Sequence, residues 1–165
     1  MSTPEIRPAT EHDWPEIWAI LSEVVTTGET MPYDPGMSSE SARGMWLEQP
    51  PGRTVVALLD GVVAGTAKMS ANRPGRGAHV STASFMVAAG SRGRGVGTIL
   101  TRDALAWARA QGFAAMQFNA VVETNTSAVA LYQREGFHIV GTVPRSFEHP
   151  VHGRVGLHVM YQEFV

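Results

Sequence analysis

The chain has 165 residues and a mass of 17.8 kDa, with 44% hydrophobic residues, 17% charged residues and a mean hydropathy of −0.06. These values predict one globular domain, residues 1–165, that can bury a core without disulfides. The absence of cysteine excludes a disulfide scaffold, a thiolate metal site and a cysteine nucleophile. A net charge of −2 provides no field that would gather nucleic acid or an anionic membrane.

Hydrophobic spacing and turn residues predict an alternation of strands and helices. We expect strands at residues 6–9, 54–59, 62–69, 79–87, 113–122, 137–143 and 155–164. We expect helices at residues 11–27, 38–48, 95–111 and 125–135, and loops at residues 28–36 and 144–153. This order predicts a mixed α/β fold whose second half is a strand–helix–strand–helix–strand unit.

The N-terminus has neither a basic region nor an apolar run behind it. No stretch approaches the roughly 20 apolar residues that a membrane-spanning helix needs. We therefore expect a cytoplasmic protein with no membrane partner and no nucleic-acid partner.

The turn before the third predicted helix is rich in glycine. Gly93, Gly95 and Gly97 fall within five positions, and Arg92 and Arg94 alternate with them. Such a turn leaves backbone N–H groups unpaired at the positive end of the helix dipole, and glycine lets an anion approach the backbone closely. These local properties predict a diphosphate site. A glycine-rich turn whose arginines are only solvated, and which binds no ligand, would have the same sequence pattern.

Known phosphate-binding patterns discriminate between ligands at this turn. A P-loop needs a lysine after its glycines, and a dinucleotide fingerprint needs a glycine where Thr98 stands. Arg92, Gly95 and Gly97 instead match Arg-x-x-Gly-x-Gly, which resembles the coenzyme A pyrophosphate motif of the GNAT superfamily of N-acetyltransferases. Downstream, residues 125–137 resemble that family's Asn-x-x-Ala-x-x-x-Tyr…Gly-Phe segment.

The resemblance covers residues 55–141 and implies a single GNAT-like domain. Its expected architecture is a central, mostly antiparallel sheet of about seven strands with one splayed pair, flanked by helices, four in this chain. The family holds acetyl-CoA between the splayed strands and on the glycine turn. The implied cofactor-binding residues are Phe85, Met86, Val87, Arg92, Gly93, Arg94, Gly95, Val96, Gly97, Thr98, Asn125 and Tyr132.

The resemblance implies a catalytic role for Tyr132, which matches the family's general acid and would protonate the departing coenzyme A thiolate. The same ring can also pack in the core. The base is less evident, because Thr82 and Ala120 stand where many relatives carry a carboxylate. Glu123 is the first choice for a catalytic base, although it would equally complement a helix dipole. His79, Glu29 and Tyr33 are the other candidates.

The 28–36 loop resembles the acceptor loop of the phosphinothricin- and amino-acid-acetylating branch. Glu29, Tyr33 and Asp34 are the expected substrate-binding residues, because they could hold an ammonium group. A second loop, 144–153, contains His149 and His152 at a spacing that does not predict a metal site. We expect that loop to wall the acceptor pocket or to form an oligomer contact.

The resemblance implies direct transfer of an acetyl group from acetyl-CoA to the primary amine of a small molecule, such as an amino acid or an amino-acid-like compound. Two alternatives stay open: a coenzyme A-binding sensor without turnover, and a protein or peptide N-acetyltransferase. A homodimer formed through the last strand or the 144–153 loop also stays open.

Overall fold

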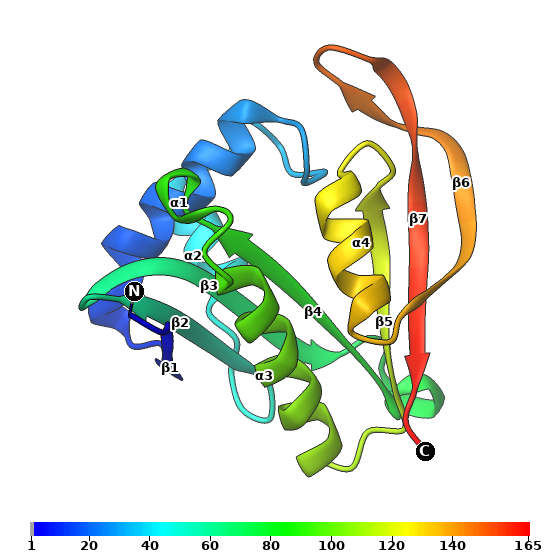
Figure 1. Cartoon of the computed structure of the whole chain (residues 1–165), viewed down its shortest axis with the longest axis horizontal. Helices are drawn as coiled ribbons and strands as arrows, with labels where there is room; N and C mark the ends of the chain where they lie inside the picture. Colours follow the sequence, from blue (N-terminus) through cyan, green and yellow to red (C-terminus); the bar gives the residue numbers. More distant parts are fainter. Residues whose placement is uncertain (1) are drawn as a thin grey trace.

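One seven-stranded sheet organises the computed structural model, which describes residues 2–165 (Figure 1). Met1, the first residue of the predicted domain, lies outside the described residues. The strand order is β1-β2-β3-β4-β5-β7-β6, and every neighbouring pair is antiparallel except β4 and β5. The strands are β1 (Glu5–Pro8), β2 (Arg53–Leu59), β3 (Val62–Ala71), β4 (Val80–Val87), β5 (Ala115–Val122), β6 (His138–His149) and β7 (Gly153–Glu163).

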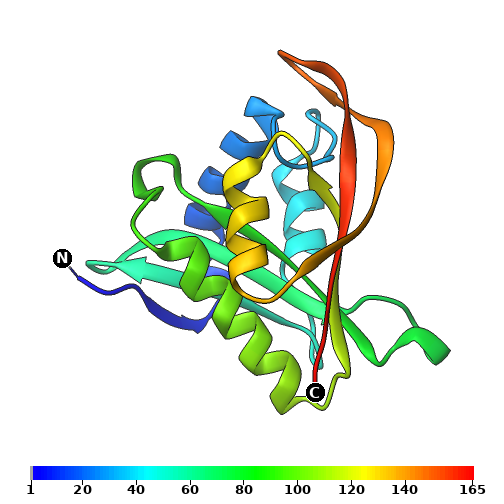
Figure 2. The ribbon, with the colours of Figure 1, turned by 45° about the vertical axis from the view of Figure 1, so that its right-hand side comes forward.

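Within residues 2–165, four α-helices cover the two faces of this sheet (Figure 2). They are α1 (Trp14–Thr27), α2 (Ser39–Trp46), α3 (Val96–Ala110) and α4 (Thr126–Arg134). Short 3-10 turns occur at Glu11–Asp13, Gly75–Gly77 and Ala89–Ser91. Helices α1 and α2 pack on one face, and α3 and α4 pack on the other.

Alternation along β2 explains why the molecule has two cores. Val55, Ala57 and Leu59 point to the face covered by α3, whereas Val56 points to the face covered by α1 and α2. Successive side chains of a strand point to opposite faces, so a strand buried on both sides reads as a continuous apolar run. Gly65 in β3 allows α3 to approach closely, because a Cβ there would lie 2.7 Å from Val96 Cγ1.

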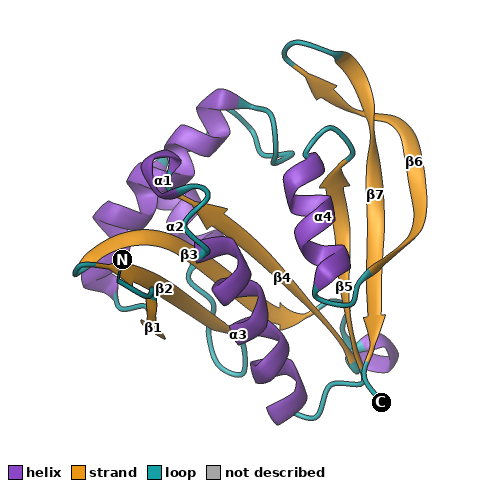
Figure 3. Cartoon of the chain, viewed as in Figure 1, coloured by secondary structure: helices purple, strands orange, loops and turns teal. Residues whose placement is uncertain are grey.

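The central parallel pair is splayed, as the resemblance implied. Strands β4 and β5 pair only at Val80–Ala115 and Ser81–Met116. Beyond this point they diverge, and Figure 3 shows α4 beside the resulting opening. The buried Ser81 hydroxyl donates to the Ala115 carbonyl at 2.8 Å and so fastens the closed end of the pair. The opening leaves the later part of β4 without a partner strand on that side.

The predicted fold class is confirmed, with one correction near the C-terminus. Residues 144–153 were expected to form a loop, but β6 continues through Pro144 to His149 and turns tightly into β7. Because β6 is an edge strand, the missing N–H of Pro144 deprives no further strand of a hydrogen bond. A register shift between Val143 and Phe147 absorbs the irregularity. Among residues 2–165, no helix is long and apolar enough to cross a membrane.

Candidate active site

A cavity of about 600 Å³ occupies the region between the splayed strands. Its wall combines the end of β4, the glycine turn, the first turns of α3, the exposed face of α4, the loop after α1 and one residue of the β6–β7 hairpin. From the predicted cofactor set it includes Phe85, Met86, Val87, Arg92, Gly93, Gly95, Val96, Gly97, Thr98, Asn125 and Tyr132. Residues from four separate parts of the sequence, 24–30, 85–101, 124–134 and 149, thus share one site.

The glycine turn presents backbone N–H groups to this cavity. Gly93 and Gly95 have φ angles of +74° and +81°, a left-handed conformation that side chains other than glycine rarely adopt. The first helical hydrogen bond of α3 runs from the Ile99 N–H to the Gly95 carbonyl. The preceding amides at 96–98 therefore have no acceptor within the helix and lie at its positive end. This is the geometry that a phosphate needs.

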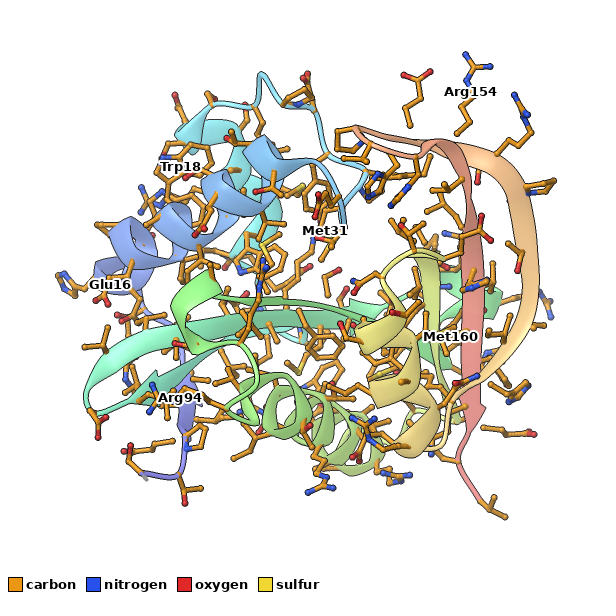
Figure 4. All side chains as sticks on the ribbon, turned by 45° about the horizontal axis from the view of Figure 1, so that its top comes forward. Glu16, Trp18, Met31, Arg94, Arg154 and Met160 are labelled. Atoms are coloured by element: carbon orange, nitrogen blue, oxygen red, sulfur yellow. The ribbon has the colours of Figure 1, made fainter. Side chains whose placement is uncertain are left out.

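The two arginines of the turn are placed differently. Both are exposed, but Arg92 lines the cavity, whereas Arg94 does not belong to the lining residues and lies on the turn as Figure 4 labels it. Gly97 lines the cavity, and a Cβ there would lie only 3.3 Å from Leu131 Cδ1, so this position leaves little room for a side chain. A diphosphate on this turn would therefore meet bare backbone and the Arg92 side chain, and Arg134 of α4 adds a second positive charge to the cavity wall.

Tyr132 lies on the cavity wall inside an aromatic cluster. Its ring centroid lies 4.6 Å from that of Phe118, 5.9 Å from that of Phe85 and 6.1 Å from that of Phe137. Burial raises the pKa of the Tyr132 phenol above its usual value, so the hydroxyl keeps its proton at neutral pH. The same residue therefore packs in the core and presents a proton donor to the cavity.

Of the four proposed bases, only Glu29 lines the cavity. The Glu123 side chain instead accepts a hydrogen bond from the Gly156 N–H of β7. His79 precedes β4, at the end of the strand opposite the glycine turn. Burial raises the pKa of the Tyr33 phenol, with a smaller opposing effect of the Ser84 hydroxyl, which makes Tyr33 a poor proton acceptor at neutral pH.

Only part of the predicted acceptor loop, residues 28–36, reaches the cavity. Glu29 and its neighbour Thr30 reach the cavity, whereas Tyr33 packs against the α1–α2 core. Asp34 is exposed, and its Oδ1 accepts the Gly36 N–H at 2.8 Å within its own turn. Met31 lies on this loop between α1 and the β6–β7 hairpin (Figure 4).

Several polar residues join the site beyond the predicted set, among them His149, Thr124 and Arg134. His149, at the end of β6, is buried and lines the cavity. Thr124 also lines the cavity, and its hydroxyl is buried without a hydrogen-bond partner. Thr124 directly precedes Asn125 of the second motif, and this position is the one feature of the sequence that could have indicated its place in the site. Among residues 2–165, no group of three or more His, Asp or Glu side chains is arranged to hold a metal ion.

The family model described as Acetyltransferase (GNAT) family matches residues 14–137 of the chain. The chain belongs to this family. The two motifs thus predicted the family correctly, and the domain is an acetyl-CoA-dependent acyltransferase.

Solved structures of the same family match nearly the whole chain. A GCN5-related N-acetyltransferase from Kribbella flavida is 54% identical, with a TM-score of 0.95 and 98% of each chain covered. A ribosomal-protein-alanine N-acetyltransferase from Brucella melitensis is 27% identical, with a TM-score of 0.86 and coverage of 97% of this chain and 99% of that one.

A phosphinothricin acetyltransferase from Sinorhizobium meliloti, solved with acetyl-CoA, is 25% identical, with a TM-score of 0.87 and coverage of 99% and 89%. Two curated yeast relatives are 34% and 33% identical to this chain, which matches 11% and 34% of their respective lengths.

Proposed function

We propose that this chain transfers an acetyl group from acetyl-CoA to the primary amine of a small molecule, in one direct step. One observation carries the proposal: the glycine turn, Tyr132 and Glu29 line a single cavity. The bound thioester supplies an activated acetyl carbon. The protein supplies the rest of the step: it binds and orients the two substrates, and it moves the protons.

Each part of the wall has a role in this proposal. The amides of residues 93–98 and the Arg92 side chain hold the pyrophosphate of the coenzyme. The backbone of Phe85, Met86 and Val87, which lacks a partner strand beyond the splay, pairs with the pantetheine arm and polarises the thioester carbonyl. Asn125 borders the same arm.

Two groups handle the protons. Glu29 accepts a proton from the incoming ammonium group, directly or through water, because it is the carboxylate on the cavity wall. Tyr132 donates its phenolic proton to the departing thiolate, since its raised pKa keeps it protonated. This assignment replaces Glu123, whose side chain already binds the Gly156 amide.

The experiment that tests the proposal measures thiol release from acetyl-CoA in the presence of an amine panel. Free amino acids, aliphatic amines and short peptides with free N-termini form its three arms. Turnover confined to the small amines supports the proposal. Turnover confined to the peptides would favour the alternative suggested by the likeness to the Brucella enzyme. Tight coenzyme binding with no turnover in any arm would favour a sensor, to which the uncharged Thr82 and Ala120 also point.

A further inference from the structure

The cavity continues from the glycine turn along the two helices α3 and α4, which lie side by side (Figure 2). On α3 it is lined by Gly97 and Thr101, which are four residues apart and so lie on one face of that helix. On α4 it is lined by Ser127, Leu131 and Arg134, which also follow the helical repeat. A ligand that contacts the glycine turn can therefore extend between the two helices.

Two contacts show that α3 and α4 run in the same direction here. Gly97 lies against Leu131, since a Cβ on the glycine would be 3.3 Å from Leu131 Cδ1. About one turn further along both helices, the Arg102 Nε–H group donates to the Glu135 carboxylate at 3.1 Å. Arg134 therefore lies about one helical turn, roughly 5 Å, beyond the contact at Gly97.

The positive charge of Arg134 is not neutralised by the protein. The neighbouring carboxylate of Glu135 is already bound by Arg102, which contacts both of its oxygens. Among residues 2–165, Arg134 has no ion-pair partner. The residue is exposed, yet it lines the cavity. The cavity wall thus carries two arginines at separate places, Arg92 at the glycine turn and Arg134 on α4.

Coenzyme A has two phosphate groups that suit these two places. Its diphosphate is attached to the 5′ carbon of the ribose, and a phosphate monoester is attached to the 3′ carbon of the same sugar. With the diphosphate on the glycine turn and Arg92, the monoester lies only one sugar away, within reach of a long side chain on the next turn of α4. The monoester carries close to two negative charges at neutral pH, and the planar guanidinium group can bind two of its oxygens at once.

We propose that Arg134 is a specificity-determining residue that binds the 3′-phosphate of coenzyme A. It distinguishes coenzyme A from dephospho-coenzyme A, which lacks only that phosphate. This inference rests on one part of the proposed function, the binding of the diphosphate at the glycine turn. It does not depend on which amine is acetylated.

The test measures the dissociation constants of coenzyme A and of dephospho-coenzyme A by calorimetric titration of the full chain. We expect the parent to bind coenzyme A at least about tenfold more tightly, because hydrogen bonds between charged groups are the strong ones. Arg134→Gln should weaken the binding of coenzyme A alone, so that the two constants come within about threefold of each other. Arg134→Lys keeps the charge without the planar fork and should retain part of the preference.

Two matched variants separate this contact from general effects of charge. Arg92→Gln should weaken both ligands by a similar factor and leave their ratio unchanged, because both contain the diphosphate. Arg76→Gln removes the same charge from an exposed turn that does not line the cavity, so both constants should stay within about twofold of the parent values. A preference for coenzyme A that falls as far in Arg76→Gln as in Arg134→Gln would overturn the proposal, because net charge would then explain it.

Phosphorus-31 NMR of bound coenzyme A provides a second readout, which needs no variant. A guanidinium group next to the 3′-phosphate favours its doubly ionised form, so the second pKa of this phosphate should fall below its value in free coenzyme A. In Arg134→Gln the pKa should return toward the value in free coenzyme A. An unchanged pKa in the parent would overturn the proposal.

The outcomes distinguish this contact from the diphosphate site on which it rests. Equal affinities for the two coenzymes in the parent, or a full preference retained in Arg134→Gln, would overturn the role of Arg134. A loss of affinity for both ligands in Arg92→Gln would still support the diphosphate site in that case. If Arg92→Gln binds both ligands as tightly as the parent, the role given to Arg92 fails, and the NMR titration decides the 3′-phosphate contact alone.

Discussion

The Glu123 side chain and the Gly156 backbone are joined twice, across β5 and β7. The Gly156 N–H donates to Glu123 Oε1, and the Glu123 N–H donates to the Gly156 carbonyl at 3.0 Å. A Cβ on Gly156 would lie 3.1 Å from the Glu123 carboxyl carbon, so the glycine makes room for this contact. The carboxylate predicted to act as base is therefore a link between strands.

This relationship predicts opposite results for two carboxylates. Glu123→Gln keeps an oxygen that can accept the Gly156 N–H, so kcat should change less than about threefold. Glu29→Gln removes the carboxylate of the cavity wall and should lower kcat about 100-fold or more. Steady-state rates at saturating acetyl-CoA measure both. A large loss in Glu123→Gln with an intact fold would restore Glu123 as the base.

The aromatic packing of Tyr132 predicts a clean removal of the proton donor. Tyr132→Phe keeps the ring contacts with Phe85, Phe118 and Phe137 and loses only the hydroxyl. We expect kcat to fall about 100-fold, the affinity for coenzyme A to stay within about twofold, and the melting temperature to be nearly unchanged. Calorimetric titration and melting curves accompany the rates. An undiminished kcat would remove Tyr132 from the proton path.

The place of Gly97 on the cavity wall predicts that side-chain bulk there blocks the coenzyme. In Gly97→Leu the new side chain would press against Leu131 and narrow the cavity, so the affinity for coenzyme A should fall at least about tenfold, and melting curves check that the domain stays folded. Gly90→Leu is the matched control, because Gly90 lies on the same turn, has open space around it and does not line the cavity. Equal affinities in the two variants would contradict the pyrophosphate assignment.

A buried carboxylate at the start of α1 predicts pH-dependent stability. Both Asp13 oxygens accept hydrogen bonds from Arg7 at 2.8 Å, and the Thr10 N–H donates to Oδ2 at 2.7 Å. The Arg7 contact is the main cause that lowers the pKa of Asp13 well below its usual range. Because the pKa of Asp13 is lower in the folded than in the unfolded state, the ionised carboxylate stabilises the folded state at every pH above its unfolded pKa, near 4. This contribution is lost as the pH falls from there toward the folded pKa.

Replacing Asp13 should therefore lower the free energy of unfolding only in the pH range in which its carboxylate is ionised. We expect Asp13→Asn to lower the free energy of unfolding by about 2 kcal/mol at pH 7, a figure that allows for the partial exposure of Arg7, and by progressively less below pH 4. Glu11→Gln is the control, since the Arg43–Glu11 pair is exposed and should contribute under about 0.5 kcal/mol. Urea unfolding across the pH range measures both. A pH-independent loss would mean that the charge is not responsible.

The sequence alone determined the local features of the protein, which depend only on residues that are neighbours along the chain. The period-2 and helical patterns predicted nearly every strand and helix, and the turn from Arg92 to Gly97 predicted a candidate phosphate site, because positive φ angles and free helix amides are local properties. Together with the segment from Asn125 to Phe137 it also identified the family. The Pro144 region was mispredicted as a loop, since edge position in a sheet is not visible from one strand alone.

Only the tertiary structure decided which polar groups meet. Glu29, Thr124 and His149 are far apart in sequence, and the splay of β4 from β5 brings them to one cavity. The same arrangement turned Glu123 toward Gly156 and buried Tyr33 against a helical core. Side-chain direction at a strand end depends on register and on the partner strand, and both are long-range properties. The proposed coenzyme site is therefore formed by residues close together in the sequence, whereas the proposed acceptor site is formed by residues that only the packing brings together.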